Sequence, residues 1–109
     1  MTAKPVVLRE RARQDIDDAI DDYAGEAGIR VALGFVDRLE QALGTIGRHP
    51  ANGSPRYAHE LNLSGLRNCA VKRFPHLIFY VERDDLIDVW RVLHAQSDIP
   101  AWMQDPQSS

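Results

Sequence analysis

Four residues of this chain have the side-chain chemistry needed to cleave RNA without a metal ion. Arg67, Lys72 and Arg91 could hold the scissile phosphate and stabilise the negative charge that develops on it. His94 could act as the acid or base that moves the 2′-hydroxyl proton. Strict alternation along the last predicted strand, however, places Arg91 and His94 on opposite faces of the sheet. The residues alone therefore favour solubilising charges at the sheet rim and a structural histidine at a strand end over a catalytic site.

The sequence lacks the signatures of metal and cofactor sites. It contains no glycine-rich phosphate loop and no paired-histidine zinc motif, and its histidines lack helical ligand spacing. The acidic run from Asp15 to Asp22 is typical of a solvated helix face. Cys69 is the single cysteine, which excludes a disulfide within the chain, and its apolar neighbours predict a buried thiol. We expect neither a metal nor a cofactor.

The composition is ordinary for a single globular domain, with 44% hydrophobic and 27% charged residues. A net charge of −3 argues against a general nucleic-acid binder. Basic residues nevertheless outnumber acidic ones between positions 56 and 76, which predicts a local basic patch. No apolar stretch is long enough to span a membrane and the N-terminus has no apolar leader, so we expect a cytoplasmic protein.

Two helices are predicted in the first half of the chain, after a short β-branched strand at 6–8. In both, apolar residues recur at three- and four-residue spacing. The first stripe consists of Ala12, Ile16, Ala19, Ile20 and Tyr23. The second consists of Ala32, Val36, Leu39, Leu43 and Ile46, broadened by Leu33 and Phe35. The break between Gly25 and Gly28 is so short that the helices must form an antiparallel hairpin, which ends near Gly47.

The second half of the chain is predicted to form strands. Residues 49–64 are rich in turn formers, so we expect an irregular, exposed loop there. Strands follow at 66–74, 76–82 and 86–94, and the middle one is apolar on both faces, as a central strand would be. The order β-α-α-β-β-β predicts an α+β fold with the helical hairpin packed on one face of an antiparallel sheet. Residues 5–103 then form one domain and 104–109 a polar tail.

Several stretches resemble the ParE branch of the RelE/ParE toxin superfamily, and together they cover about residues 5–103. The start of the first helix, Arg11–Ile16, and the pair Pro50 and Gly53 are similar to that family. The sheet region carries Leu66-Arg67-Asn68 and then Val71-Lys72-Arg73-Phe74-Pro75-His76-Leu77-Ile78-Phe79-Tyr80. The most specific stretch is Ile87-Asp88-Val89-Trp90-Arg91-Val92-Leu93-His94-Ala95-Gln96-Ser97-Asp98-Ile99-Pro100.

The resemblance implies a RelE-like fold and a toxin that inhibits DNA gyrase, and with it replication, until a ParD-like antitoxin neutralises it. RNA-cleaving relatives tend to carry an aromatic residue near the end of the last strand, often after a histidine. Here Ala95 follows His94, and no tyrosine occurs after Tyr80. The local residues therefore favour the ParE function, which implies no catalytic residues.

The resemblance also implies two contact surfaces. The expected target contacts are Arg67, Lys72, Arg73, Arg91 and, as an anchor, Trp102. The expected antitoxin contacts on the helical hairpin are Ala19, Tyr23, Leu39 and Leu43. The implied assembly is a toxin–antitoxin heterotetramer that reaches DNA only through the antitoxin.

Two alternatives stay open. One is a RelE-like, ribosome-dependent mRNA endonuclease that uses His94 with Arg67, Lys72 and Arg91. The other is a degenerate relative that survives only as a binding partner.

Overall fold

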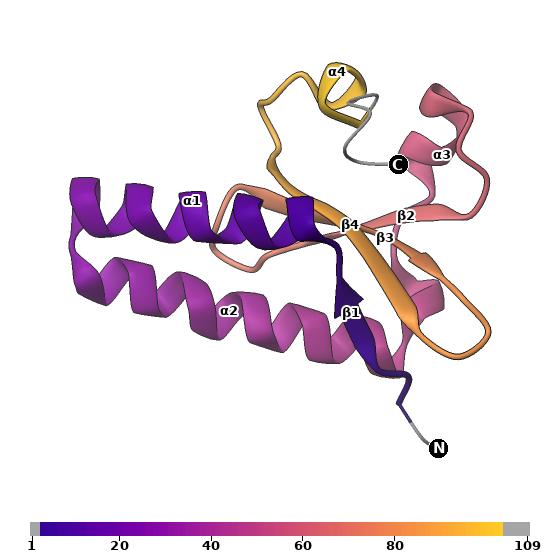
Figure 1. The fold of residues 1–109 in the computed structure, drawn as a ribbon, viewed down its shortest axis with the longest axis horizontal. Coiled ribbons are helices and arrows are strands. Elements are labelled where there is room, and N and C mark those ends of the chain that lie inside the picture. Colours follow the sequence, from indigo (N-terminus) through magenta and orange to yellow (C-terminus); the bar gives the residue numbers. More distant parts are fainter. Residues whose placement is uncertain (1–2, 104–109) are drawn as a thin grey trace.

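The computed structural model describes residues 3–103, and the predicted polar tail at 104–109 lies outside them. A helical hairpin lies beside a four-stranded sheet (Figure 1). In chain order the elements are β1 (Val6–Leu8), α1 (Glu10–Ala27), α2 (Ile29–Arg48), η1 (Pro50–Asn52), α3 (Arg56–Leu61), β2 (Leu66–Ala70), β3 (His76–Glu82), β4 (Ile87–His94) and α4 (Ile99–Met103). The α+β class and the order β-α-α-β-β-β of the predicted elements are confirmed, and η1, α3 and α4 are additional short helices.

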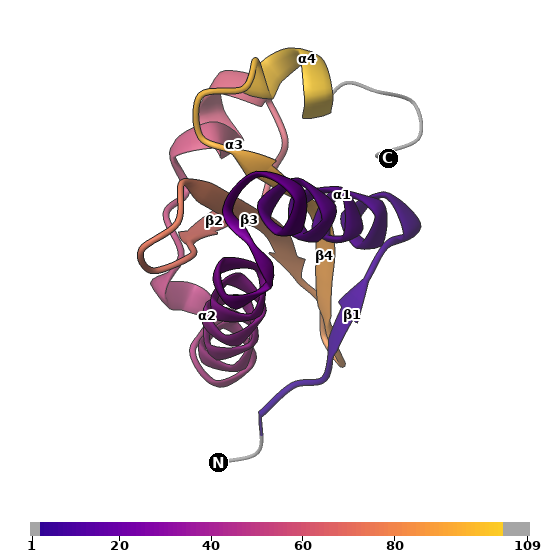
Figure 2. The same cartoon turned by 90° about the vertical axis from the view of Figure 1, so that its left-hand side faces the viewer.

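The hairpin reverses direction at a single residue. Gly28 separates α1 from α2 and has a φ of 97°, a conformation that residues with a Cβ rarely adopt. The link is therefore shorter than the predicted break, because Gly25 still belongs to α1. In both views the two helices lie one beside the other along the same side of the sheet (Figures 1 and 2).

The sheet is mixed, with strand order β1-β4-β3-β2. β2, β3 and β4 run antiparallel, as predicted, and β3 is a central strand. β1 departs from the antiparallel expectation, because it pairs in parallel with β4 from Val6 opposite Ile87 to Leu8 opposite Val89. This pairing makes β1 and β2 the two edges of the sheet.

Both faces of the sheet are covered by helices. The larger core lies under the hairpin and includes Ala12, Ile16, Phe35, Leu39, Ile46, Ile78, Tyr80 and Val89. The second core includes Leu66, Phe79, Val81, Leu93, Ile99 and Met103, with side chains of α3 packed against it. The irregular loop expected at 49–64 is wrong in part, because η1 and α3 form there, although most residues of the segment are exposed as expected. Tyr57 and Leu61, one turn apart on α3, supply an apolar face that covers the sheet.

A β-bulge interrupts the alternation of β4. Phe79 pairs with Arg91 and Tyr80 with Val89, which leaves Trp90 as an extra residue. Past the bulge, Val92 returns to the core under the hairpin, the face that Val89 also occupies. The strict alternation expected for this strand therefore fails across the bulge. Pairing is regular from Arg91 to His94, so the prediction that these two residues lie on opposite faces of the sheet still holds.

Candidate functional site

Arg91 joins three elements in the interior of the protein. Its Nε and Nη2 atoms donate hydrogen bonds of 2.7 and 2.8 Å to the two carboxylate oxygens of Asp15 on α1. Its Nη1 atom donates to the backbone oxygen of Trp102 on α4, at 3.1 Å. The Asp15 carboxylate also accepts the backbone N–H of Val92 at 3.0 Å. This buried pair therefore fixes α1 and α4 against β4.

Burial removes Arg91 from the set of surface contacts. Its side chain is 0% exposed, so neither a protein target nor an RNA phosphate can reach the guanidinium in this conformation. The expectation that Arg91 is a target contact or a phosphate clamp is corrected accordingly. The physical reason is Asp15, whose carboxylate satisfies the guanidinium from a position distant in sequence.

Trp102 lies partly at the surface, although its helix folds back onto the body. Ile99 and Met103 of α4 are buried against the sheet, whereas the Trp102 side chain is 44% exposed. The Arg91 guanidinium carbon lies 5.3 Å from the centre of the indole ring, within cation–π range. The Trp102 ring thus contacts the buried Arg91 on one side and is accessible to a partner on its exposed side.

A cleft of about 270 Å³ opens between α1 and the ends of β3 and β4. It is lined by Ala19, Asp22, Tyr23, Glu26, His76 and His94. The His76 and His94 rings lie 5.5 Å apart, edge to face. Burial, with a smaller contribution from the charge of His94, lowers the pKa of His76, although Asp15 acts in the opposite direction. His76 is therefore neutral near pH 7.

His94 is the last residue of β4, and its ring contacts the turn that follows. Its Nδ1 atom accepts the backbone N–H of Gln96 at 3.1 Å, and that hydrogen bond fixes the ring. One imidazole nitrogen is thus engaged by the backbone, as a structural histidine requires. The Nε2 atom is the one left for other contacts.

The floor of this cleft rests on a cluster of aromatic rings. The Tyr23 ring lies 5.4 Å from Phe35 and 5.3 Å from Phe74, and Phe35 lies 5.0 Å from the ring of His76. Burial and, to a lesser degree, the charge of Glu26 raise the pKa of the Tyr23 hydroxyl. Tyr23 thus presents a protonated hydroxyl at the rim of the cleft while its ring packs inside.

Arg67 stabilises the loop before β2. Its Nη1 atom donates to the backbone oxygen of Gly53 at 2.7 Å. Next to it, the Tyr80 hydroxyl donates to the backbone oxygen of Pro50 at 2.6 Å, and burial raises the pKa of that hydroxyl. A Cβ atom at Gly53 would overlap the Tyr80 hydroxyl. Arg67 is half-buried and its described contact is structural.

Lys72 and Arg73 occupy the turn between β2 and β3, and both are exposed. Arg73 has a φ of 71°, in the left-handed region, where a non-glycine residue is uncommon. Lys72 lines a groove against α2, whereas His94 lines the cleft at α1. The residues considered for RNA cleavage therefore point to different parts of the described structure.

The predicted antitoxin contacts divide into buried and half-buried residues. Ala19 is 8% and Leu39 4% exposed, and both face the sheet as part of the larger core. Tyr23 and Leu43 are half-buried and pack against that core. These residues were predicted from the apolar stripes of the two helices, and the sheet covers those stripes. Ala19 and Leu39 are therefore not exposed docking residues.

Apolar exposure on the hairpin occurs instead at the start of α2. Ile29, Val31 and Leu33 are among the exposed large hydrophobic residues, with Ile29 65% and Leu33 57% exposed. This patch was not predicted from the sequence, because Leu33 lies next to the apolar stripe of the second helix and broadens it. Helical spacing could have revealed the patch. Ile29 and Leu33 are four residues apart and therefore share a helix face, and this face is not the one that carries the stripe Ala32, Phe35 and Leu39.

The Cys69 thiol, predicted to be buried, is half-exposed on the edge strand β2. No group of acidic, histidine or cysteine residues within 3–103 could hold a metal ion. Within the same residues, no helix has the length and apolar character required to cross a bilayer.

Comparison with known proteins places these features in a family. A family model described as the ParE toxin of the type II toxin–antitoxin system parDE matches residues 6–99. The Caulobacter vibrioides protein Toxin ParE1 is 32% identical over 92 residues, which cover 84% of this chain and 88% of that protein.

A solved structure shares the fold. It is a chain of the chromosomal ParDE toxin–antitoxin system from P. aeruginosa and superposes with a TM-score of 0.71 at 18% identity. The match covers 84% of this chain and 96% of the other.

Proposed function

We propose that this chain, which belongs to the ParE family of toxins of type II toxin–antitoxin systems, inhibits DNA gyrase and is neutralised by a ParD-like antitoxin in the cytoplasm. The observation that carries the proposal is the family match along nearly the whole chain, residues 6–99. The toxin acts by binding other proteins and has no catalytic residues.

The placement of the candidate nuclease residues supports a binding function. A nuclease needs its phosphate-binding groups and its acid or base within reach of one scissile bond. Here Arg91 is buried against Asp15, Arg67 is bound to the Gly53 carbonyl, and His94 accepts a backbone N–H. Lys72 lines a separate groove. The RelE-like alternative therefore lacks support from the geometry.

The proposed gyrase contacts are the predicted residues that reach the surface, namely Lys72, Arg73 and Trp102. Trp102 is the anchor, because a large aromatic side chain on a rigid base gives much contact area at small entropic cost. Arg67 joins them only through the exposed part of its side chain. Arg91 contributes indirectly, by positioning α4 through the backbone oxygen of Trp102.

The proposed antitoxin surface consists of the half-buried and exposed apolar residues of the hairpin. Tyr23 lies at the rim of the cleft between α1 and the sheet, and Leu43 is half-buried further along. The exposed Ile29 and Leu33 extend this surface with apolar area that a partner's amphipathic segment could cover. Complexes of two toxin and two antitoxin chains are the proposed assembly, in which the antitoxin supplies the DNA-binding part.

Expression of the chain without an antitoxin tests the proposal against both alternatives. We expect growth arrest in which DNA synthesis falls before protein synthesis, with no new mRNA ends by primer extension. Early loss of protein synthesis with cuts at codon positions would instead establish the nuclease. Normal growth, with the folded protein present in the cells, would establish a degenerate toxin.

A further inference from the structure

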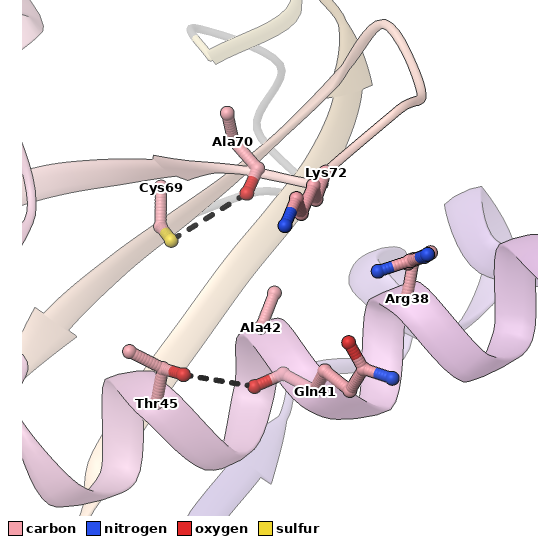
Figure 3. A pocket seen from close by; sticks show the side chains of 7 residues that line it. All are labelled: Arg38, Gln41, Ala42, Thr45, Cys69, Ala70 and Lys72. Carbon is pink, nitrogen blue, oxygen red and sulfur yellow. Dashed lines mark hydrogen bonds between the residues drawn. The ribbon is translucent and has the colours of Figure 1, made fainter.

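A groove of about 250 Å³ runs between α2 and the edge strand β2 (Figure 3). Small apolar groups form much of its surface, and polar side chains from α2 and the turn after β2 stand around it. The lining residues are Arg38, Gln41, Ala42, Thr45, Cys69, Ala70 and Lys72. None of them has a part in the predicted contact surfaces except Lys72.

Two cations face this groove from opposite walls. Arg38 rises from α2, and Lys72 extends from the turn after β2 toward α2 (Figure 3). Within residues 3–103, neither side chain has an ion pair or a side-chain hydrogen bond. Asp37 and Glu40 are close to Arg38 in sequence but do not line the groove. The protein as a whole carries a net charge of −3, so this groove is a local site of unneutralised positive charge.

The thiol in the groove does not neutralise these cations. Burial raises the pKa of Cys69, which keeps the thiol protonated and neutral at pH 7. The Thr45 hydroxyl donates to the backbone oxygen of Gln41 at 3.1 Å, one turn back on the same helix. Positive charge and an apolar floor are therefore the two properties that this groove offers to a ligand.

The backbone of β2 adds a third property. Ser54 and Asn68 exchange two backbone hydrogen bonds of 2.9 Å on the outer edge of this strand. In an antiparallel ladder, backbone groups two residues apart point to the same side, so the N–H and C=O of Ala70 point to that outer edge as well. The Ala70 carbonyl oxygen already accepts a long hydrogen bond from the Cys69 thiol, at 3.7 Å, whereas the Ala70 N–H has no partner within residues 3–103. Ser54 covers the edge only at Asn68, and Ala70 is exposed. The Ala70 N–H is therefore the group of this strand end that is open to a further strand.

We propose that this groove docks an extended, acidic segment of a partner protein, which pairs with the edge of β2 at Ala70 and places a carboxylate between Arg38 and Lys72. Strand addition supplies main-chain hydrogen bonds, and the two cations select the acidic side chain. Small side chains of the segment rest on Ala42 and Ala70. The inference deepens the proposed antitoxin partnership by naming the kind of segment that would occupy this site.

A protein segment fits this site better than a nucleic acid does. Nucleic-acid binding draws its affinity from several neutralised phosphates along a backbone. The groove offers two facing cations and an apolar floor, in a protein that is acidic overall. An acidic peptide can use the positive charge, the apolar floor and the edge of β2, whereas a phosphate backbone would use only the charge.

The test uses a short fluorescein-labelled peptide of alternating valine and glutamate, with binding followed by fluorescence anisotropy at low salt. We expect Arg38→Gln and Lys72→Gln each to weaken binding by about threefold to tenfold, because each variant loses one ion pair that is exposed or half-exposed. Arg30→Gln is the matched control, because Arg30 is an exposed arginine of α2 outside the groove, and its affinity should equal that of the wild type. A peptide with glutamine in place of glutamate should bind more weakly than the acidic peptide.

Three further results would overturn the proposal. The first is that the acidic peptide does not bind the wild type. The second is that the Arg38→Gln and Lys72→Gln variants bind the peptide as tightly as the wild type does. The third is a single-stranded oligothymidine that binds more tightly than the peptide and depends on the same two cations. Full affinity of a peptide N-methylated at alternate amides would remove the strand-pairing part. Neither gyrase nor antitoxin is present in these measurements, so their failure is distinguishable from failure of the proposed function.

Discussion

Removing the Asp15 carboxylate should destabilise the protein more than any surface substitution on α1. The Asp15→Ala variant deletes the acceptor of two Arg91 hydrogen bonds and of the Val92 N–H. It leaves a guanidinium with 0% exposure in the interior without its charged partner. Loss of one member of a buried ion pair costs about 3–5 kcal/mol, because the remaining charge stays desolvated.

Urea and thermal unfolding followed by circular dichroism measure this loss. At about 4 °C per kcal/mol for a domain near this size, the melting temperature should fall by about 12–20 °C. The Asp17→Ala variant is the matched control, since Asp17 is an exposed acidic residue of the same helix, and its free energy of unfolding should stay within about 0.5 kcal/mol of the wild type. Asp15→Asn keeps a hydrogen-bond acceptor and should lie between the two.

A double variant separates the pair's net contribution from the cost of an unpaired charge. Replacing both partners, as Asp15→Leu with Arg91→Met, removes the buried charge and should recover part of the stability that Asp15→Ala loses. A loss below about 1 kcal/mol in Asp15→Ala would refute the reasoning, because it would mean that the pair contributes no more than a surface pair.

Three other predictions concern single residues. The lowered pKa of His76 means that the unfolded chain binds its proton more readily, so stability should fall as pH drops below about 6.5, and His76→Phe should flatten this dependence in urea titrations across that range. Gly53→Ala should cost about 1–3 kcal/mol in thermal unfolding, because the added methyl group meets the Tyr80 hydroxyl; an unchanged melting temperature would show that the loop yields freely. Trp102→Ala should retain the wild-type melting temperature within a few degrees and reduce growth inhibition on expression; undiminished toxicity would exclude Trp102 as the anchor.

The elements with strong periodicity were predictable from the sequence. The apolar stripe through Ala32, Leu39 and Ile46 requires a helix with one buried face, and the structure buries all three. The doubly apolar run of β3 likewise required a central strand, because both of its faces had to be covered. Local pattern was sufficient in these cases because each element carries its own burial signal.

Short elements and irregular pairing were not predictable in this way. The two turns of α3 are preceded by Asn52, Gly53 and Pro55, which are turn formers, so the segment had the composition of a loop. The bulge at Trp90 depends on how β4 pairs with β3 and leaves no mark in the composition of β4. One extra residue shifts the alternation on one side of the bulge relative to the other, so alternation predicts faces only within each half of β4.

The candidate contact residues show the same limit. Arg91 has the residue type of a surface contact, and only the three-dimensional position of Asp15, on a helix far away in sequence, makes it a core residue. Ala19 and Leu39 belong to apolar stripes that the sequence could assign either to the core or to a partner. In the structure both residues pack in the core against the sheet. Charge on a strand therefore indicates a candidate but does not establish exposure.

The most direct test of the proposed function is a supercoiling assay in which purified gyrase is titrated with the folded protein. The account predicts loss of supercoiling together with trapped, cleaved DNA, and its reversal by a ParD-like antitoxin. The Trp102→Ala variant should need more protein for the same inhibition, whereas Arg30→Gln should behave as the wild type. Full gyrase activity in the presence of a folded toxin that still binds its antitoxin would contradict the central claim.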